Sequence, residues 1–127
     1  MSPRTAFLLM LFPLGVAACA FGYYARGTLS DVPEELRGKA FPGSATGGGR
    51  FELADRRGML RCDGEMAPPD MAGVAGSCAG ESGKGIVRCS DGREMAAHWS
   101  AISCRAMQGE AVDERGNRLT FRVERKR

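Results

Sequence analysis

The chain has 127 residues, a length that suits one domain, and its formal net charge is only +3. A charge this small gives no large basic field, so we expect no nucleic-acid partner. Five cysteines in a chain of this length point to disulfide bonds in an oxidising compartment.

The first part of the chain has the pattern of a secretory signal. A positive start at Arg4 is followed by an uncharged stretch rich in Leu, Phe and Met, which ends in small residues. We therefore expect residues 1–18 to be a signal peptide that is removed. The rest of the chain would then lie outside the cytoplasm.

The end of this segment carries a more specific motif. Val16-Ala17-Ala18-Cys19 resembles the lipobox of bacterial lipoproteins, in which small residues precede one cysteine. The resemblance implies that Cys19 is lipidated and becomes the first residue of the mature chain. It also implies a membrane anchor that faces the periplasm. The outer membrane is favoured over the inner one, because Ala20 stands where an Asp commonly retains such proteins in the inner membrane.

Two other interpretations of this region stay open. The small-x-small triplet at 18–20 also fits a cleavage site that would release a soluble protein. Residues 5–25 are uncharged, and about 20 residues are enough for a helix to span a bilayer. Tyr23 and Arg26 would then form the aromatic and cationic edge of an N-terminal helical anchor.

Residues 19–49 are expected to hold the lipid anchor and a flexible tether. Gly, Pro, Ser and Thr are frequent, and no apolar period persists. A short turn of helix over 32–37 could form, capped by Ser30 or Asp31. A flexible coil of 30 residues averages roughly 30 Å end to end, which would hold a domain clear of a membrane surface.

The folded domain is expected over residues 50–127, where short strand patterns alternate with turn residues. The predicted strands are 50–54, 59–62, 73–78, 85–89, 94–104, 110–113 and 119–124. Strands of this length and spacing predict an all-β fold, either a small β-sandwich or a barrel. An amphipathic helix over 94–107 is the weaker alternative.

The core of this domain is thin, since it holds eleven Leu, Ile, Val or Phe in 78 positions. A domain this small usually needs additional stabilisation, for example by disulfide bonds. Apart from the lipidation cysteine, an even number of cysteines remains, and we expect these to form two disulfides: Cys62, Cys78, Cys89 and Cys104. We favour the local pairs Cys62–Cys78 and Cys89–Cys104, and the crossed pairs Cys62–Cys89 and Cys78–Cys104 stay open.

A short phrase occurs twice in the domain. Residues 58–66 read GMLRCDGEM, and residues 85–95 read GIVRCSDGREM. The similarity extends to a later Ser-Cys pair, which gives two units over 58–81 and 85–110. We expect each to be a hairpin-like unit with a tight turn at its Asp-Gly pair, because both residues tolerate positive φ. The repeat is therefore interpreted as duplicated scaffold.

Three side chains are candidate ligand contacts. Arg61 and Arg88 occupy equivalent places in the two units and have no structural task there, so they could form a paired anion site, although a solvated face is the simpler interpretation. Trp99 is expected to be either the largest core residue or an exposed platform for a ligand.

We expect no metal, no cofactor and no enzymatic activity. The four later cysteines are separated by 15, 10 and 14 residues, whereas zinc knuckles need two cysteines close together. His98 is the only histidine, and no Gly-x-Ser-x-Gly elbow surrounds a serine. A small periplasmic hydrolase that uses His98 is the lesser alternative.

Together these observations favour an exported, membrane-anchored lipoprotein with a binding or structural role in the bacterial cell envelope, where an envelope protein could be its partner. In its layout of lipid anchor, tether and cysteine-stapled β-barrel, the chain resembles small lipoprotein inhibitors of lysozyme. That resemblance adds an inhibitor-like module as an alternative, although the inhibitory motifs of that group do not occur in the chain.

Overall fold

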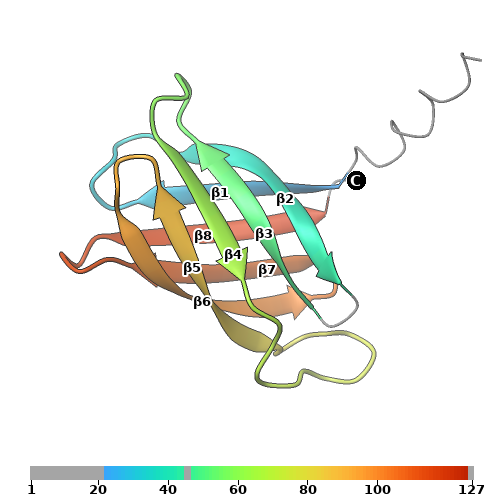
Figure 1. Cartoon of the computed structure of the whole chain (residues 1–127). Coiled ribbons are helices and arrows are strands. Elements are labelled where there is room, and N and C mark those ends of the chain that lie inside the picture. The colour runs from blue at the N-terminus through green and yellow to red at the C-terminus, as the bar shows by residue number, and fades with distance from the viewer. Residues whose placement is uncertain (1–21, 45–46, 126–127) are drawn as a thin grey trace, which may run out of the picture.

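Eight antiparallel strands make up the part of the chain that the computed structural model describes, residues 22–44 and 47–125 (Figure 1). The strands are β1 (Tyr23–Leu29), β2 (Leu36–Ser44), β3 (Gly47–Ala54), β4 (Arg61–Met66), β5 (Ser82–Cys89), β6 (Glu94–Ser103), β7 (Ala106–Val112) and β8 (Arg118–Arg125). Each strand pairs with the next, and β8 pairs with β1, which closes the sheet into an up-and-down barrel. The prediction of a small, disulfide-stapled all-β domain is confirmed, in its barrel form.

The barrel begins earlier in the chain than the sequence pattern predicts. β1, β2 and the start of β3 lie in the range 19–49, so the prediction of a flexible tether there is wrong. Small residues face the barrel interior in these strands, which hides the strand pattern. Ala25 and Ala40 are buried, and a Cβ at Gly27 would lie 3.0 Å from the side chain of Leu53.

The observed strands also contradict two predicted helices and shorten the range that a third could occupy. Leu36 begins β2, so the turn of helix over 32–37 is absent, and residues 94–103 form β6. Residues 23–25 belong to β1, so a spanning helix cannot extend to residue 25. In the described ranges, we find no helix with the length and apolar character needed to cross a membrane. The signal segment and Cys19 lie outside the described residues.

The two repeated phrases do not form equivalent units. Asp91-Gly92 makes the expected tight turn between β5 and β6, with Gly92 at a φ of 97°. Asp63-Gly64 is not a turn, because β4 continues through it. Gly64 instead lies opposite Phe51 of β3, and the Phe51 ring fills the place where a Cβ would be.

The two disulfides join the repeats rather than closing each one. The bonds are Cys62–Cys89 and Cys78–Cys104, so the favoured local pairing is wrong and the crossed alternative is correct. Strand direction gives the reason. Cys62 is near the start of β4 and Cys78 follows its far end, and a six-residue strand is about 17–20 Å long. Cys62 and Cys89 are direct partners on β4 and β5, with Cα atoms 4.0 Å apart.

Bulky interior side chains lie opposite glycines on neighbouring strands. Trp99 is the register partner of Gly83, and a Cβ there would come within 2.7 Å of the indole. Phe121 faces Gly109 in the same way, at 2.6 Å. An eight-stranded barrel is just wide enough for side chains to fill, so each missing Cβ gives one aromatic ring its space.

Candidate ligand-binding site

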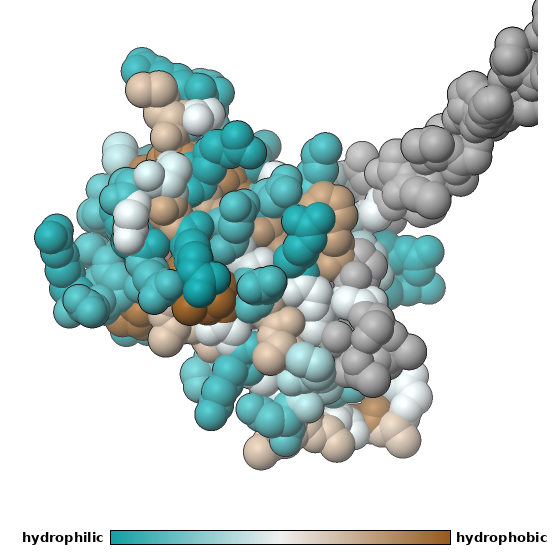
Figure 2. Space-filling model, in the orientation of Figure 1, coloured by the Kyte–Doolittle hydropathy of each residue, from teal (hydrophilic) through white to brown (hydrophobic). Residues whose placement is uncertain are grey.

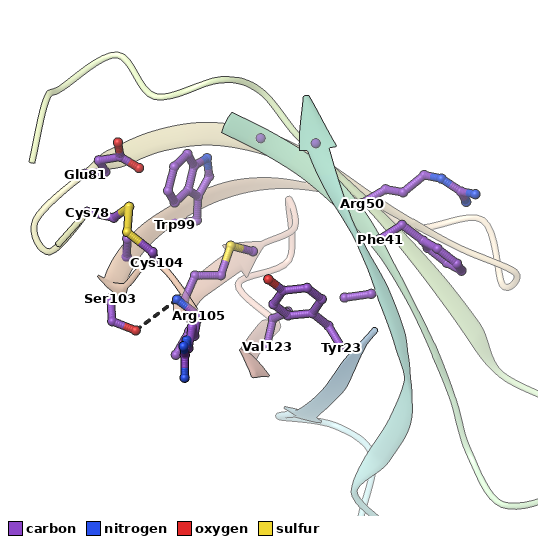
Figure 3. A pocket seen from close by; sticks show the side chains of 16 residues that line it. Tyr23, Phe41, Arg50, Cys78, Glu81, Trp99, Ser103, Cys104, Arg105 and Val123 are labelled. Atoms are coloured by element: carbon purple, nitrogen blue, oxygen red, sulfur yellow. Dashed lines mark hydrogen bonds between the residues drawn. A yellow bond between two sulfur atoms is a disulfide. The ribbon is translucent and has the colours of Figure 1, made fainter. Parts of the chain in front are cut away.

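The two ends of the barrel are filled differently. At one end, which we call the closed end, large apolar side chains fill the interior and are at most 1% exposed: Leu29, Leu36, Leu53, Met95 and Leu119. At the other end, which we call the open end, β1 and β7 begin and β6 and β8 finish. The interior of the open end is hollow (Figure 3).

The hollow at the open end has a volume of about 260 Å³. Its interior wall consists mainly of apolar side chains: Tyr23, Ala40, Trp99, Ala101, Met107 and Val123. An apolar cavity of about 150 Å³ holds benzene, and sites for drug-sized ligands begin near 300 Å³. The hollow therefore has room for a small or slender apolar group.

Small residues create this space. Ala40 of β2 and Ala101 of β6 face the interior at the open end. At the closed end, the interior positions of the strands hold larger side chains. Figure 3 shows Tyr23 and Trp99, which come from different strands, among the side chains that line the hollow.

Trp99 is a core residue and not an exposed platform. It is 5% exposed, and its indole lies against Gly83. Its Nε1–H donates a hydrogen bond to the carbonyl oxygen of Ala67 at 3.1 Å, which satisfies the one polar group of the indole. Trp99 also lines the hollow from the inside. The core interpretation is therefore confirmed, and the exposed platform is wrong.

A long loop, residues 67–81, stands beside the open end. The prediction of a strand over 73–78 is wrong, because these residues belong to this loop. Cys78–Cys104 and a hydrogen bond from Ala101 N–H to the Glu81 carbonyl at 2.7 Å tie the loop to β6. Figure 2 shows pale and brown surface on the projecting loop, whereas the barrel wall is mostly hydrophilic. The apolar side chains of the loop are exposed, Met71 by 62% and Val74 by 65%.

Charged residues stand around the rim of the hollow. Arg50 lies over the ring of Phe41, 4.4 Å from its centroid, and 3.6 Å from a carboxylate oxygen of Glu52. Arg105 is exposed, and within the described part of the chain no carboxylate pairs with its guanidinium. Glu81 lies on the other side of the Cys78–Cys104 disulfide from Arg105 (Figure 3).

Arg93 joins three loops at the closed end. Its guanidinium contacts Asp31 of the β1–β2 loop at 3.0 Å and Asp91 of its own turn at 2.9 Å. It also lies 3.9 Å from Asp113, which follows β7. The Arg93 side chain is only 16% exposed, so these contacts are better shielded from water than the other ion pairs of the described barrel.

The acids around Arg93 are held in their charged form. Hydrogen bonds from Arg93 lower the pKa of Asp31 and of Asp91. Burial alone would raise the pKa of Asp113, but hydrogen bonds from Asn117 and the charge of Arg93 lower it overall. Hydrogen bonds to Asp31 and Asp91 raise the pKa of Arg93. Because Arg93 interacts with all three carboxylates, it holds together the loops that carry them. We call this cluster the Arg93 clamp.

Arg61 and Arg88 lie on the outer wall, on β4 and β5, and neither lines the hollow. Arg88 pairs with Glu94 at 2.9 Å and has Asp63 as its register partner, so acids stand on both sides of it. Arg61 is exposed. Their role as ligand contacts stays a prediction.

His98 points outward from β6 and is exposed. It shares a depression of the outer wall with Ser82, Ser100 and Glu110. In residues 22–44 and 47–125, no hydrogen bond joins His98 to any of these side chains, and no group of three or more His, Cys, Asp or Glu could hold a metal ion.

Sequence reasoning named Trp99 but missed the rest of the hollow. Tyr23 and Ala40 lie in the range assigned to the tether. Met107 and Arg105 belong to none of the sequence motifs described above. The alternation of Tyr23, Ala25, Gly27 and Leu29, which all face inward, was the available signal for β1.

No protein-family model matches the chain, and no curated protein shows significant similarity to it. The geometry of the barrel is therefore the basis for any functional proposal.

Proposed function

We propose that this protein is an exported, membrane-anchored lipoprotein of the bacterial cell envelope that binds a small apolar or amphiphilic molecule in the open end of its barrel. The observation that carries the binding role is the hollow of about 260 Å³ beside Trp99 and Tyr23. Ligand sites in barrels commonly lie at their mouths and have mainly apolar walls with a few polar groups.

The cellular part of the proposal rests on other observations. The lipobox ending at Cys19 supports a lipid anchor, and Ala20 after it supports the outer membrane. Two disulfides support an oxidising compartment such as the periplasm. Intact mass of the protein extracted from membranes tests the anchor. We expect a chain that starts at Cys19 with acyl groups added, and a chain that starts at Ala20 or keeps all 127 residues would contradict it.

A binding role is better supported than hydrolysis. A hydrolase would need His98 to activate a nucleophile through a hydrogen bond. His98 faces solvent on the outer wall, and its serine and glutamate neighbours make no such bond with it in the described barrel. An inhibitor-like role toward an envelope protein would use the outer surface and would not need the hollow.

Titration with N-phenyl-1-naphthylamine, a neutral apolar probe that fluoresces in apolar surroundings, tests the binding role. We expect saturable fluorescence from the full chain in phospholipid nanodiscs. Ala101→Leu should fill the hollow and abolish the saturable part. Ala96→Leu is the matched control, because Ala96 is exposed on the outer face of the same strand. Equal signals from the two variants would refute the binding role.

A further inference from the structure

We propose that the hollow is a site for one acyl chain of an anionic amphiphile, whose head group lies at the rim beside Arg105. This inference rests on the proposed function, because it takes the hollow to be a binding site and names the chemical class of its ligand.

The interior of the hollow selects for a hydrocarbon tail. Its deeper wall is made by Trp99, Ala101, Met107 and Val123. The indole N–H of Trp99 already bonds to Ala67, and within the described residues no buried side-chain nitrogen or oxygen lacks a partner. Apart from the Tyr23 hydroxyl, this wall offers a polar ligand little in return for its hydrogen bonds to water, whereas each methylene that enters is favourably removed from water.

The rim selects for an anionic head group. Three charged residues line it, and Arg50 already interacts with Glu52 and the Phe41 ring. Arg105 has no carboxylate partner in the described part of the chain, and a guanidinium binds carboxylates and phosphates through two parallel hydrogen bonds. Glu81 lies beyond the disulfide and repels an anion, so the head group is directed toward Arg105.

The backbone holds Arg105 firmly at this position. Its N–H donates to the Ser103 hydroxyl oxygen at 3.0 Å. Its carbonyl accepts a hydrogen bond from the N–H of Arg125 at 2.9 Å, which sets a second exposed arginine residue beside it. Two neighbouring arginines strengthen the positive field where the hollow meets solvent.

The rim also gives an acyl chain a route from a membrane. Exposed Met71 and Val74 belong to the loop that the Cys78–Cys104 disulfide ties to the end of β6, and Ile102 of β6 is 40% exposed. Cys19 precedes Tyr23 by four residues, and four residues span at most about 14 Å. A lipid on Cys19 would therefore keep the open end close to the bilayer.

The anionic amphiphile comes from the membrane, and the protein's own lipid on Cys19 is a competitor for the hollow that carries no anionic group. The test uses Trp99, which is the one tryptophan of the chain and lines the hollow. Stearate that carries a nitroxide at carbon 16 or at carbon 5 is added to the full chain in unlabelled phospholipid nanodiscs. We expect the carbon-16 label to quench Trp99 more strongly, because the tail end enters first.

Matched variants separate the site from simple partitioning into the bilayer. Ala101→Leu should remove the saturable quenching, and Ala96→Leu should keep it. Arg105→Gln should weaken stearate binding about tenfold but leave stearyl alcohol binding unchanged, since only the acid makes the charged hydrogen bonds. Arg61→Gln, at an exposed arginine of the outer wall, is the control and should change neither.

The lipidated chain and the Cys19→Ala variant distinguish a membrane ligand from the protein's own lipid. If both accept added stearate, the ligand comes from the membrane. If only the variant accepts it, the protein's own neutral acyl chain fills the hollow, and the proposal of an anionic ligand is overturned. Stronger quenching by the carbon-5 label, or no saturable quenching in either form, would overturn the inference. If the naphthylamine probe still binds and stearate does not displace it, only the acyl-chain inference fails and the proposed function stands.

Discussion

The closed end and the open end of the barrel use the same strands in different ways. Along β6, Met95 and Ala97 toward the closed end are 0% and 3% exposed, whereas Ala101 toward the open end borders a hollow. Arg93 draws three loops together at the closed end. One long loop, held by Cys78–Cys104, borders the open end. The difference teaches that one small barrel can be tightly packed at one end and keep open space at the other.

The largest effect is expected from removing the disulfide nearer the closed end. Replacing Cys62 and Cys89 by alanine should lower the free energy of unfolding by about 3–5 kcal/mol, because it removes a loop constraint and buried sulfur atoms. Replacing Cys78 and Cys104 removes a constraint of almost the same length, 26 residues against 27. We expect about 2–3 kcal/mol there, because the rim is more exposed. Urea unfolding measures both values, and equal losses would contradict the contrast between the ends.

A smaller effect on the free energy of unfolding is expected when an interior alanine at each end is replaced by leucine. Ala97→Leu adds volume to a packed interior and should cost about 1–3 kcal/mol. Ala101→Leu adds the same volume next to the hollow and should cost about 0.5 kcal/mol or less. Thermal unfolding of the two variants checks this. A larger loss for Ala101→Leu would show that the open end is packed like the closed end.

Arg93→Gln should have a modest effect at neutral pH, about 1 kcal/mol, because its partners are partly exposed. The effect depends on pH. The pKa values of Asp31, Asp91 and Asp113 are lowered in the folded state. Their contribution is therefore present above the unfolded pKa of about 3.9 and is lost as the pH falls through the lower folded values.

Melting temperatures from pH 7 to pH 2 test the Arg93 clamp. The wild-type chain should lose stability below about pH 4 more steeply than Arg93→Gln, so the two curves converge in acid. Arg118→Gln removes an exposed pair with Glu110 and serves as the control, since it should shift the curve little at any pH. Parallel curves for wild type and Arg93→Gln would show that Arg93 does not hold these acids.

Some features of the barrel could be predicted from local pattern alone. Leu119, Phe121 and Val123 alternate with polar residues, and all three are buried in β8. The even number of cysteines that follow Cys19 predicted two disulfides. Their pairing could not be predicted, because it depends on the register that places Cys62 opposite Cys89.

The missed features share a physical cause. A glycine inside a strand and a glycine in a turn look the same in sequence. Gly64 serves the first purpose by leaving room for the Phe51 ring, whereas Gly92 serves the second. Likewise, Ala25 and Ala40 give no apolar signal, although both are buried strand residues. The hollow itself combines residues from six strands, so no local stretch of sequence contains it.

The seam between β1 and β8 has a consequence for how the protein is made. Tyr23 pairs with Arg125, and Leu29 pairs with Leu119. The first strand of the barrel therefore cannot complete its pairing until the last strand is present. Whichever end of the chain emerges first, the barrel cannot close until nearly every residue is available. Contacts this distant in sequence also form slowly. During that interval β1 has an unpaired edge, which a chaperone or a second incomplete chain could pair with.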